Sequence, residues 1–554
     1  MCLATIRLTA EANRHLRSFT SDRRPKLQPR VLAPGLHADF GVTKDRSGLY
    51  AVFVVCAVAA TRILFRSHLL YDIDSVNFAL ALRRFDPAVH QPHPPGYFLY
   101  VCLGRLANML LPDPNTALVA ISIAASCGAA WMIYLLTKEW FGGGPAFVST
   151  VLFLVSPLCW FHGIVALTYI VEAFFSALIG YLCWKVYSGN AAFVIPASLA
   201  FAVAAGFRPS TGLLLAPLWL VSVHRMDGRR RWLALLAAGV AIAVWFIPMV
   251  EASGGINRYF GSLMHLWLAV PGQRTTLSSP ALAVARLVTH AWIFILCFGA
   301  ATPFVFRRLE RRGGEITQHT RFIYAWVGPG LLFFTFVYFL YVNSGYLLLV
   351  CPPAFAWISV GIYRFARSQQ RRLVRRAVLA GGVAVNCAIF LCAPIYCSHK
   401  GVRDFERDLA AVRQDFGQYL DPANTLIIGF DSHFLGYRHA GFYLPSFATV
   451  QYPEVPYSDG PHVFLMRNGE TEVVRSFVID RFEHFVFFPL PEGSEYSTYV
   501  NRVLAGLPAG VVNPITVGKR KVLAGPAWAI PLMFRSTAQC TSTAKCSANP
   551  HPGA

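Results

Sequence analysis

The stretch YDIDSVNFALALRRFDPAVHQPHPPGYFLYV (residues 71–101) follows directly on the first long apolar run of the chain. Two aspartates, Asp72 and Asp74, stand where a membrane-spanning helix is expected to end, and a cluster of histidines and prolines comes after them. The chain then turns apolar again from Gly96 onward. Whether this stretch is a plain connection or a site of chemistry depends on how the rest of the chain is organised.

The composition is that of a membrane protein. Hydrophobic residues make up 55% of the 554 residues, charged residues make up only 14%, and the mean hydropathy is +0.47, whereas soluble domains carry about 25% charged residues. The formal charge of +21 gathers in clusters between apolar runs, namely HRMDGRRRW (224–232), RRLERR (307–312) and RSQQRRLVRR (367–376). Basic clusters of this kind are typical of cytoplasmic loops, so the charge indicates topology and not a nucleic-acid partner.

Eleven apolar runs approach the length of about 20 residues that a spanning helix needs. They lie near residues 49–66, 115–137, 145–161, 168–187, 191–207, 209–223, 232–250, 281–305, 322–342, 345–363 and 377–397. A twelfth run, at 96–111, is shorter and is interrupted by Arg105 and Asn108. The fold class predicted from these runs is a polytopic α-helical membrane protein with about 11 spanning helices.

The positive-inside rule decides how the twelfth run lies. If the basic clusters and the basic N-terminal leader face the cytoplasm, Asp72 emerges on the outer face, and the run at 96–111 begins and ends on that face. We therefore expect 96–111 to be an amphipathic helix lying on the outer interface. Residues 75–85 also have helical apolar spacing and predict a second interfacial helix, with Asp74 at or near its N-cap.

The sequence divides into four expected parts. They are a basic, cytoplasmic and unstructured leader (1–48), a transmembrane domain (49–398) whose first outer loop is 67–114, an extracytoplasmic α/β domain (399–535) and a disordered tail (536–554). The α/β domain is predicted from a helical stretch at 403–416 and β-like runs at 425–430, 462–467 and 484–489. The thirteen cysteines include no CxxC pair, and most lie in apolar runs, where a thiol behaves as a small hydrophobe. Cys540 and Cys546 can pair only if the tail is extracytoplasmic.

Asp72 and Asp74 are the candidate catalytic carboxylates. A carboxylate beside the membrane is costly, so it is either functional or solvated, and a wet acidic loop is the alternative. A helix-anchored aspartate on the outer face suits a general base acting on an extracytoplasmic acceptor. His90 and His93, in the following loop, can bind a phosphate or a divalent metal, or simply hydrogen-bond within the loop.

The motifs IDSVNFA (73–79) and PHPPGYFLYVCLGRL (92–106) together resemble the GT-C glycosyltransferases. The resemblance is strongest to the branch of the dolichyl-phosphate-mannose–protein mannosyltransferases and aminoarabinose transferases, and it covers about residues 49–400. It implies juxtamembrane helices in the first outer loop, a polyprenyl-phosphate sugar donor, and catalysis that requires no cofactor or metal. The family's catalytic aspartate falls on Asp74 within DSVNF, with Ser75 in place of the family's glutamate and Asp72 as an additional acid.

Further residues on the expected outer side can contact such a donor. Arg208, in AGFRPSTG between two apolar runs, can meet a lipid phosphate or snorkel to lipid headgroups. Glu172 and Tyr169, in ALTYIVEAFF, can bind the sugar, or Glu172 can pair with Arg208.

Two more stretches carry candidate donor contacts. Residues 251–276 include Arg258, Tyr259 and His265, a composition that suits phosphate and sugar but also suits an interfacial aromatic belt. Tyr346, in YVNSGYLLLV, stands near a position where related enzymes have a charged Arg-Tyr pair and this chain has Gly345–Tyr346.

The function implied by the resemblance is transfer of a sugar, with inversion, from a polyprenyl phosphate to a protein, lipid or glycan acceptor. The expected location is the bacterial inner membrane, with the site on the extracytoplasmic face. The alternatives are a transporter or flippase, a non-catalytic envelope scaffold, and another lipid-linked polymerase or ligase. A transporter would be expected to show internal repeats and helices broken at the bilayer midplane, and the sequence shows neither.

Overall fold

The structure is a computed structural model of the chain. The described residues are 47–269, 280–305, 316–336, 341–452, 455–457, 460–474, 477–479, 481–489, 507–534 and 538–539. The expected leader up to residue 46 and all of the expected tail except Ala538 and Gln539 lie outside them, as do Cys540 and Cys546.

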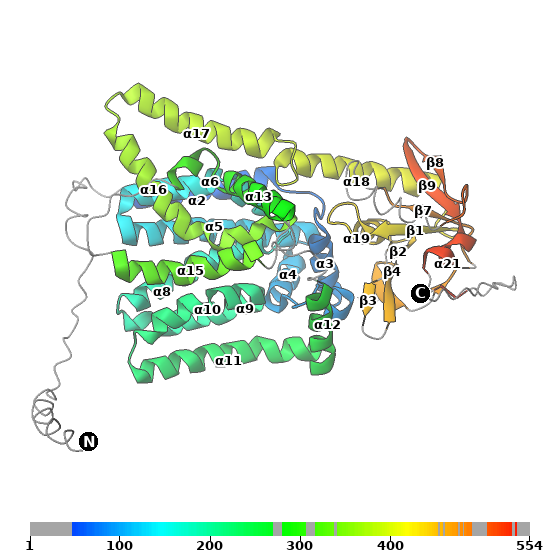
Figure 1. The fold of residues 1–554 in the computed structure, drawn as a ribbon, viewed down its shortest axis with the longest axis horizontal. Coiled ribbons are helices and arrows are strands. Elements are labelled where there is room, and N and C mark those ends of the chain that lie inside the picture. The colour runs from blue at the N-terminus through cyan, green and yellow to red at the C-terminus, as the bar shows by residue number, and fades with distance from the viewer. Residues whose placement is uncertain are drawn as a thin grey trace, which may run out of the picture. The chain divides into compact units, whose positions relative to one another are not determined.

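The first half of the membrane domain is a series of apolar helices that pack side by side (Figure 1). They are α2 (Ser47–Phe65), α5 (Pro114–Phe141), α6 (Gly143–Val155), α7 (Pro157–His162), α8 (Tyr169–Tyr187), α9 (Val194–Phe207), α10 (Pro209–His224) and α11 (Gly228–Ala252). Helix α5 contacts α2, α6 and α8, and the packing continues from α8 through α9 to α11. Along α11, a stripe of exposed apolar side chains faces outward, formed by Leu236, Val240, Val244 and Ile247. A stripe of this kind suits contact with lipid and not with water.

The second half continues the helical domain. Its elements are α12 (Ile256–Ala269), α13 (Pro280–Phe298), α14 (Thr302–Val305), α15 (Ile316–Phe336), the 3₁₀ segment η5 (Tyr341–Leu349), α16 (Cys351–Ser368) and α17 (Arg372–Cys392). Six helices of the described ranges are long and apolar enough to cross a membrane, which supports an integral membrane protein, and four further apolar helices are shorter. The expected number of eleven spans therefore stays a prediction.

The connection between α2 and α5 contains both helices predicted there. They are α3 (Ile73–Arg83) and α4 (Phe98–Leu110), separated by the short 3₁₀ turn η1 (Pro87–Val89). Arg105 of α4 ties the two helices together, because its guanidinium donates to the carbonyl oxygens of Leu82 (3.0 Å) and Ala81 (3.0 Å) at the end of α3. The arginine that interrupts the apolar run thus satisfies carbonyls that the end of a helix leaves open.

The C-terminal domain begins with α18 (His399–Tyr419) and contains a mixed sheet with the strand order β3-β4-β2-β1-β7-β9-β8 (Figure 1). Strand β1 (Thr425–Phe430) is central and pairs in parallel with β2 (Ala448–Tyr452) and β7 (His484–Phe487). The outer strands are antiparallel: β3 (Val455–Tyr457), β4 (Gly460–Arg467), β5 (Glu470–Val474), β8 (Asn513–Val517) and β9 (Arg520–Pro526). The three strands and the helix predicted for this region are present.

Short elements complete the C-terminal domain. Helix α19 (Tyr437–Tyr443) packs on β1 and β2, and also on α3 from the connection between α2 and α5. A short turn and helix, η6 (Ala527–Ala529) and α21 (Ile530–Met533), follow β9. The strands β6 (Phe477–Val478) and β10 (Ala538–Gln539) form a separate two-stranded pair. All six residues of β1 are buried, as is usual for a strand whose two faces are covered.

Close packing of α8 on α15 depends on Gly180. A Cβ at this position would overlap the indole ring of Trp326, whose Nε1 donates to Ser176 Oγ at 2.8 Å. We expect Gly180→Ala to lower the stability of the detergent-solubilised protein by about 1–3 kcal/mol, the usual cost of overpacking a core. Thermal unfolding followed by intrinsic fluorescence measures this change.

Gly239 of α11 provides the matched control, because nothing lies within 4 Å of a Cβ placed there. Gly239→Ala is expected to leave the unfolding midpoint unchanged or slightly higher. An equal drop in both variants would show that overlap with Trp326 is not the cause of the loss.

Candidate functional site

The start of α3 separates the roles of the two aspartates. Asp72 is the N-cap residue, and its Oδ1 accepts a hydrogen bond from the backbone N–H of Asp74 at 2.9 Å. Asp74 lies in the first helical turn, where the positive end of the helix dipole favours a carboxylate. Because Asp72 supplies the cap, the side chain of Asp74 is left available for other contacts.

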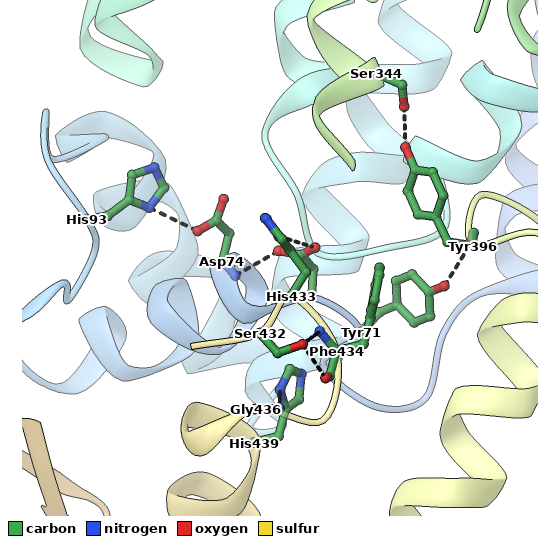
Figure 2. Close-up of polar contacts among 11 residues, drawn as sticks. Tyr71, Asp74, His93, Ser344, Tyr396, Ser432, His433, Phe434, Gly436 and His439 are labelled. Atoms are coloured by element: carbon green, nitrogen blue, oxygen red, sulfur yellow. Dashed lines mark hydrogen bonds and ion pairs between the residues drawn. The ribbon is translucent and has the colours of Figure 1, made fainter. Parts of the chain in front are cut away.

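Asp74 is paired with a histidine from the proline-rich loop. Its Oδ1 lies 3.1 Å from Nδ1 of His93 (Figure 2). Nε2 of His93 lies 2.9 Å from the hydroxyl of Tyr97. The loop turns sharply here, since Gly96 has φ +109° and Tyr97, the N-cap of α4, is also left-handed. A glycine is required at position 96, because L side chains rarely adopt this φ.

The surrounding charges keep Asp74 ionised. Burial by itself would raise the pKa of Asp74, but the charge and hydrogen bond of His93, together with the charges of His433 and Arg208, hold that pKa well below its usual range. Its side chain still keeps 25% of its surface exposed. The site therefore presents a stable and reachable carboxylate at neutral pH.

Arg208 lies between α9 and α10 and is only 4% exposed. Its guanidinium carbon lies 4.3 Å from the ring centroid of Tyr169 and 4.4 Å from that of Tyr346, so it packs against two rings whose own centroids are 5.5 Å apart. An arginine buried to this extent does not snorkel to lipid headgroups, so that alternative is wrong. Gly345 permits the arrangement, because a Cβ there would overlap the ring of Tyr169.

Polar neighbours fix the orientation of Arg208. Its Nη1 donates to Thr168 Oγ1 at 2.7 Å, and its Nε donates to Ser210 Oγ at 3.2 Å. Nε also lies 3.6 Å from Oε2 of Glu172, while Oε1 of Glu172 accepts from Thr211 Oγ1 at 2.9 Å. Of the two alternatives for Glu172, the structure therefore contains the pairing with Arg208.

The aspartate group and the arginine group meet around Tyr97. The guanidinium carbon of Arg208 lies 5.7 Å from the ring centroid of Tyr97, whose hydroxyl contacts His93, which in turn contacts Asp74. The structure thus brings together most of the residues predicted for the site. They are Asp72, Asp74, His93, Tyr169, Glu172, Arg208 and Tyr346.

Arg258 lies apart from this group. The stretch 251–276 contains α12, and Nη2 of Arg258 lies 2.9 Å from Oδ2 of Asp86, a carboxylate that also pairs with Arg84 at 3.0 Å. The neighbouring Tyr259 hydroxyl donates to the carbonyl oxygen of Pro95 at 3.1 Å. These contacts hold the proline-rich loop from the side of α12, and contact of Arg258 with a donor stays a prediction.

The ring of His90 lies 5.3 Å from that of Phe464. Burial, with the charges of Arg438 and His93, lowers its pKa to about 3, so the imidazole is neutral. Within the described ranges, no group of three or more His, Cys, Asp or Glu side chains is arranged to hold a metal ion.

His433 is the residue of the site that the sequence reasoning missed. It belongs to the C-terminal domain and is labelled in Figure 2. Its Nδ1 lies 3.3 Å from Oδ2 of Asp72. Asp431, His433 and Arg438 follow the carboxyl end of β1, which is central in the sheet. Binding residues often gather at the carboxyl ends of parallel strands, and that signal in FDSHFLGYRH (430–439) could have indicated them.

Comparison with solved structures places this arrangement in a known fold. ArnT from Cupriavidus metallidurans bound to undecaprenyl phosphate superposes with a TM-score of 0.53 at 14% sequence identity, covering 88% of this chain and 98% of ArnT. The same protein in its apo state gives a TM-score of 0.50 at 12% identity, with 86% and 97% covered. The chain has the GT-C fold. The GT-C resemblance found for residues 49–400 thus extends, as a fold, into the C-terminal domain.

A more distant likeness is to the oligosaccharyltransferase of Archaeoglobus fulgidus, with a TM-score of 0.44 at 13% identity and 72% of this chain covered. The chain spans 63% of the length of that protein, and this likeness carries no further weight here. No protein-family model and no curated protein matches the sequence. At these identities the comparisons establish the GT-C fold, and the chemistry has to be argued from the site.

Proposed function

We propose that this protein is a glycosyltransferase that moves a sugar from a polyprenyl-phosphate donor to an acceptor hydroxyl on the extracytoplasmic face of the membrane. The observation that carries the proposal is the ionised and partly exposed Asp74, 3.1 Å from His93, in a chain with the GT-C fold. A carboxylate held in this way on the first turn of a helix is pre-positioned to accept a proton. The bacterial inner membrane is the proposed location.

Asp74 acts as the general base in this mechanism. As the acceptor oxygen attacks the anomeric carbon, its proton passes to the carboxylate of Asp74. The bond between the anomeric carbon and the donor phosphate oxygen breaks, and its electron pair leaves with the lipid phosphate. Attack from the face opposite the phosphate inverts the anomeric configuration, and no metal or redox partner is needed to balance the step.

Arg208 is the proposed cation for the donor phosphate. Its guanidinium is oriented by Thr168 and Ser210 and needs no reorganisation when charge develops on the leaving group. A phosphate bound beside Asp74 adds negative charge, which raises the pKa of that carboxyl and makes it a stronger base. Donor binding would therefore switch Asp74 from a well-ionised but weak base to an effective one.

The aromatic rings beside Arg208 are suited to contact with the sugar of the donor. Tyr169 and Tyr346 lie in T-shaped contact with each other beside the guanidinium, and Tyr97 adds a hydroxyl at the junction with His93. Aromatic faces with a nearby hydroxyl combine apolar contact with a polar handle. Glu172, which is 1% exposed and lies behind Arg208, orients the arginine in this proposal and does not contact the sugar.

Removal of His93 is expected to move the acid side of the pH profile. His93 is the largest influence that lowers the pKa of Asp74, so His93→Ala raises that pKa toward the ordinary value for an aspartate. Since the base must be ionised, transfer by the variant should be lost at a higher pH than transfer by the wild type as the pH falls. The pH dependence of kcat/KM reports this shift.

His399→Ala is the control for that measurement, since His399 contacts Arg403 in α18 and has no contact with Asp74. Its acid limb should coincide with that of the wild type. An unchanged acid limb in His93→Ala would contradict the assignment of Asp74 as the titrating base.

The function itself is tested by incubating membranes that contain the protein with polyprenyl phosphates carrying different radiolabelled sugars. The expected result is movement of one label from the lipid fraction to a protein, lipid or glycan fraction, dependent on the protein. A transporter or flippase would move the intact labelled lipid or solute across the bilayer without breaking the sugar–phosphate bond. Label that never leaves the polyprenyl phosphate would refute the proposal.

A further inference from the structure

The C-terminal domain forms hydrogen bonds with the chain segment that leads into α3. Nη2 of Arg403 donates to the carbonyl oxygen of Arg66 at 2.6 Å. Oε1 of Glu406 accepts from the backbone N–H groups of His68 (2.5 Å) and Leu69 (3.2 Å). Three backbone groups of this segment, on Arg66, His68 and Leu69, thus find their hydrogen-bond partners on α18.

The hold continues up to the cap of α3. The hydroxyl of Tyr443 accepts from the N–H of Leu70 at 2.8 Å, and the carbonyl oxygen of His433 accepts from the N–H of Ile73 at 2.9 Å. The ring of His433 then contacts Asp72, which accepts from the N–H of Asp74. His433 is therefore joined to the start of α3 through both its backbone and its side chain.

These contacts form a continuous path to the site. It runs from His433 Nδ1 to Asp72 (3.3 Å), from Asp72 to the N–H of Asp74 (2.9 Å), and from Asp74 to His93 (3.1 Å). Each link fixes the next, since Asp72 is both the ion-pair partner of His433 and the cap that sets the first turn of α3. A displaced Asp72 would let this turn, and Asp74 with it, shift or fray.

The charge of His433 is set by its surroundings. The titratable groups that face it are Asp72 and Asp74 on α3, Asp431 in its own loop, and His439 on α19. Burial by itself would lower the pKa of His433, but the three carboxylates raise it to about 9. Burial also lowers the pKa of His439 to about 3, so that neighbour is neutral and does not compete for the proton.

We propose that His433 is a positioning residue for the transfer reaction, whose imidazolium holds the capping carboxylate of Asp72 and thereby fixes Asp74 against His93. This inference rests on the proposed function for its kinetic consequences. The C-terminal domain then contributes to the catalytic site, because its residue His433 sets the position of the base Asp74.

The pH dependence follows from the sign of the shift. A histidine whose pKa is raised in the folded protein contributes its ion pair fully below its ordinary pKa of about 6.5. That contribution is lost as the pH rises through about 9. Transfer by the wild type should therefore fall on the alkaline side with an inflection near pH 9.

Two variants distinguish the effect of the positive charge of His433 from the effect of having a polar side chain at this position. His433→Ala removes both the charge and the donor, and misplacing the base should lower kcat by about 10-fold to 100-fold with little change in the donor KM. His433→Asn keeps a neutral donor in the place of Nδ1, so it should show the reduced activity of the deprotonated wild type at every pH. Both variants should lack the inflection near pH 9.

His484→Asn is the matched control, since His484 lies in β7 of the same domain and contacts Thr425 at 2.9 Å. It should keep both the wild-type kcat and the alkaline inflection. If His433 had a purely structural role, the His433 variants would have a lower kcat but would keep the inflection near pH 9. An inflection that persists in His433→Asn, or a wild-type kcat in His433→Ala, would overturn the proposal.

A readout that needs no activity keeps this inference separate from the proposed function. Hydrogen–deuterium exchange of the full-length protein should show faster exchange of residues 70–78 in His433→Ala than in the wild type, with α18 unchanged. If Asp74→Asn retains transfer, the proposed function fails and the exchange result still decides whether His433 holds α3. If Asp74→Asn is inactive while the His433 variants match the wild type in exchange and kinetics, only this inference fails.

Discussion

Asp74→Asn is expected to lower sugar transfer by about 10²-fold to 10⁴-fold, the range that a positioned general base contributes. The amide keeps the size of the carboxylate and can still hydrogen-bond to His93, but it cannot take the proton of the acceptor hydroxyl. The stability of helix α3 is not expected to change, because its capping group is the side chain of Asp72. The measurement is the rate of label transfer by purified protein, with the unfolding midpoint recorded alongside.

Asp113→Asn is the matched control. Asp113 also begins a helix, with its Oδ2 accepting from the N–H of Thr116 at 2.8 Å, and asparagine caps a helix nearly as well as aspartate. This variant should keep the wild-type rate. Normal transfer by purified Asp74→Asn would remove Asp74 from the mechanism. If Asp72→Asn then lost transfer while Asp74→Asn kept it, Asp72 would be the base.

Local signals in the sequence were sufficient for the elements around this base. The apolar spacing of residues 75–85 predicted α3, and the short run at 96–111 predicted α4, because amphipathic periodicity is decided by neighbours within a few residues. The β-like run TLIIGF (425–430) became β1 with the predicted bounds. In all three segments the same few residues determine both the pattern and the structure.

Contacts between distant segments could not be read in this way. His433 contacts Asp72 across 361 residues, and nothing in either local pattern indicates the other. Arg258 likewise pairs with Asp86, 172 residues away, and neither local pattern indicates the other. The pairing of Glu172 with Arg208 was among the stated alternatives, because a buried arginine in apolar surroundings needs an anion.

Helix boundaries show a third case. The run expected to span at 145–161 is divided at Ser156, which caps α7 by accepting from the N–H of Cys159, with Pro157 at the first helical position. Apolar composition continues across this break, so hydropathy alone predicts one helix, whereas the backbone forms two. The serine–proline pair is the local feature that marks the division.

Arg208→Gln is expected to have the second large effect, in two parts. Removing the guanidinium leaves the buried Glu172 without its ion-pair partner, which costs about 3–5 kcal/mol and should reduce the amount of folded protein. The loss of a preorganised cation for the leaving phosphate should lower transfer further, by about 10²-fold to 10³-fold. The single variant cannot separate these two effects.

The double variant Arg208→Gln/Glu172→Gln separates them. Removing both charges relieves the unpaired carboxylate, so the unfolding midpoint should return most of the way to that of the wild type. If Arg208 binds the donor phosphate, transfer stays low in this stable variant, and the affinity for a polyprenyl-phosphate lipid falls with it. Recovery of transfer together with stability would instead show that Arg208 serves only to neutralise Glu172. Arg208→Lys adds a further distinction, because lysine keeps the charge but cannot reproduce the planar fork that Thr168 and Ser210 now orient.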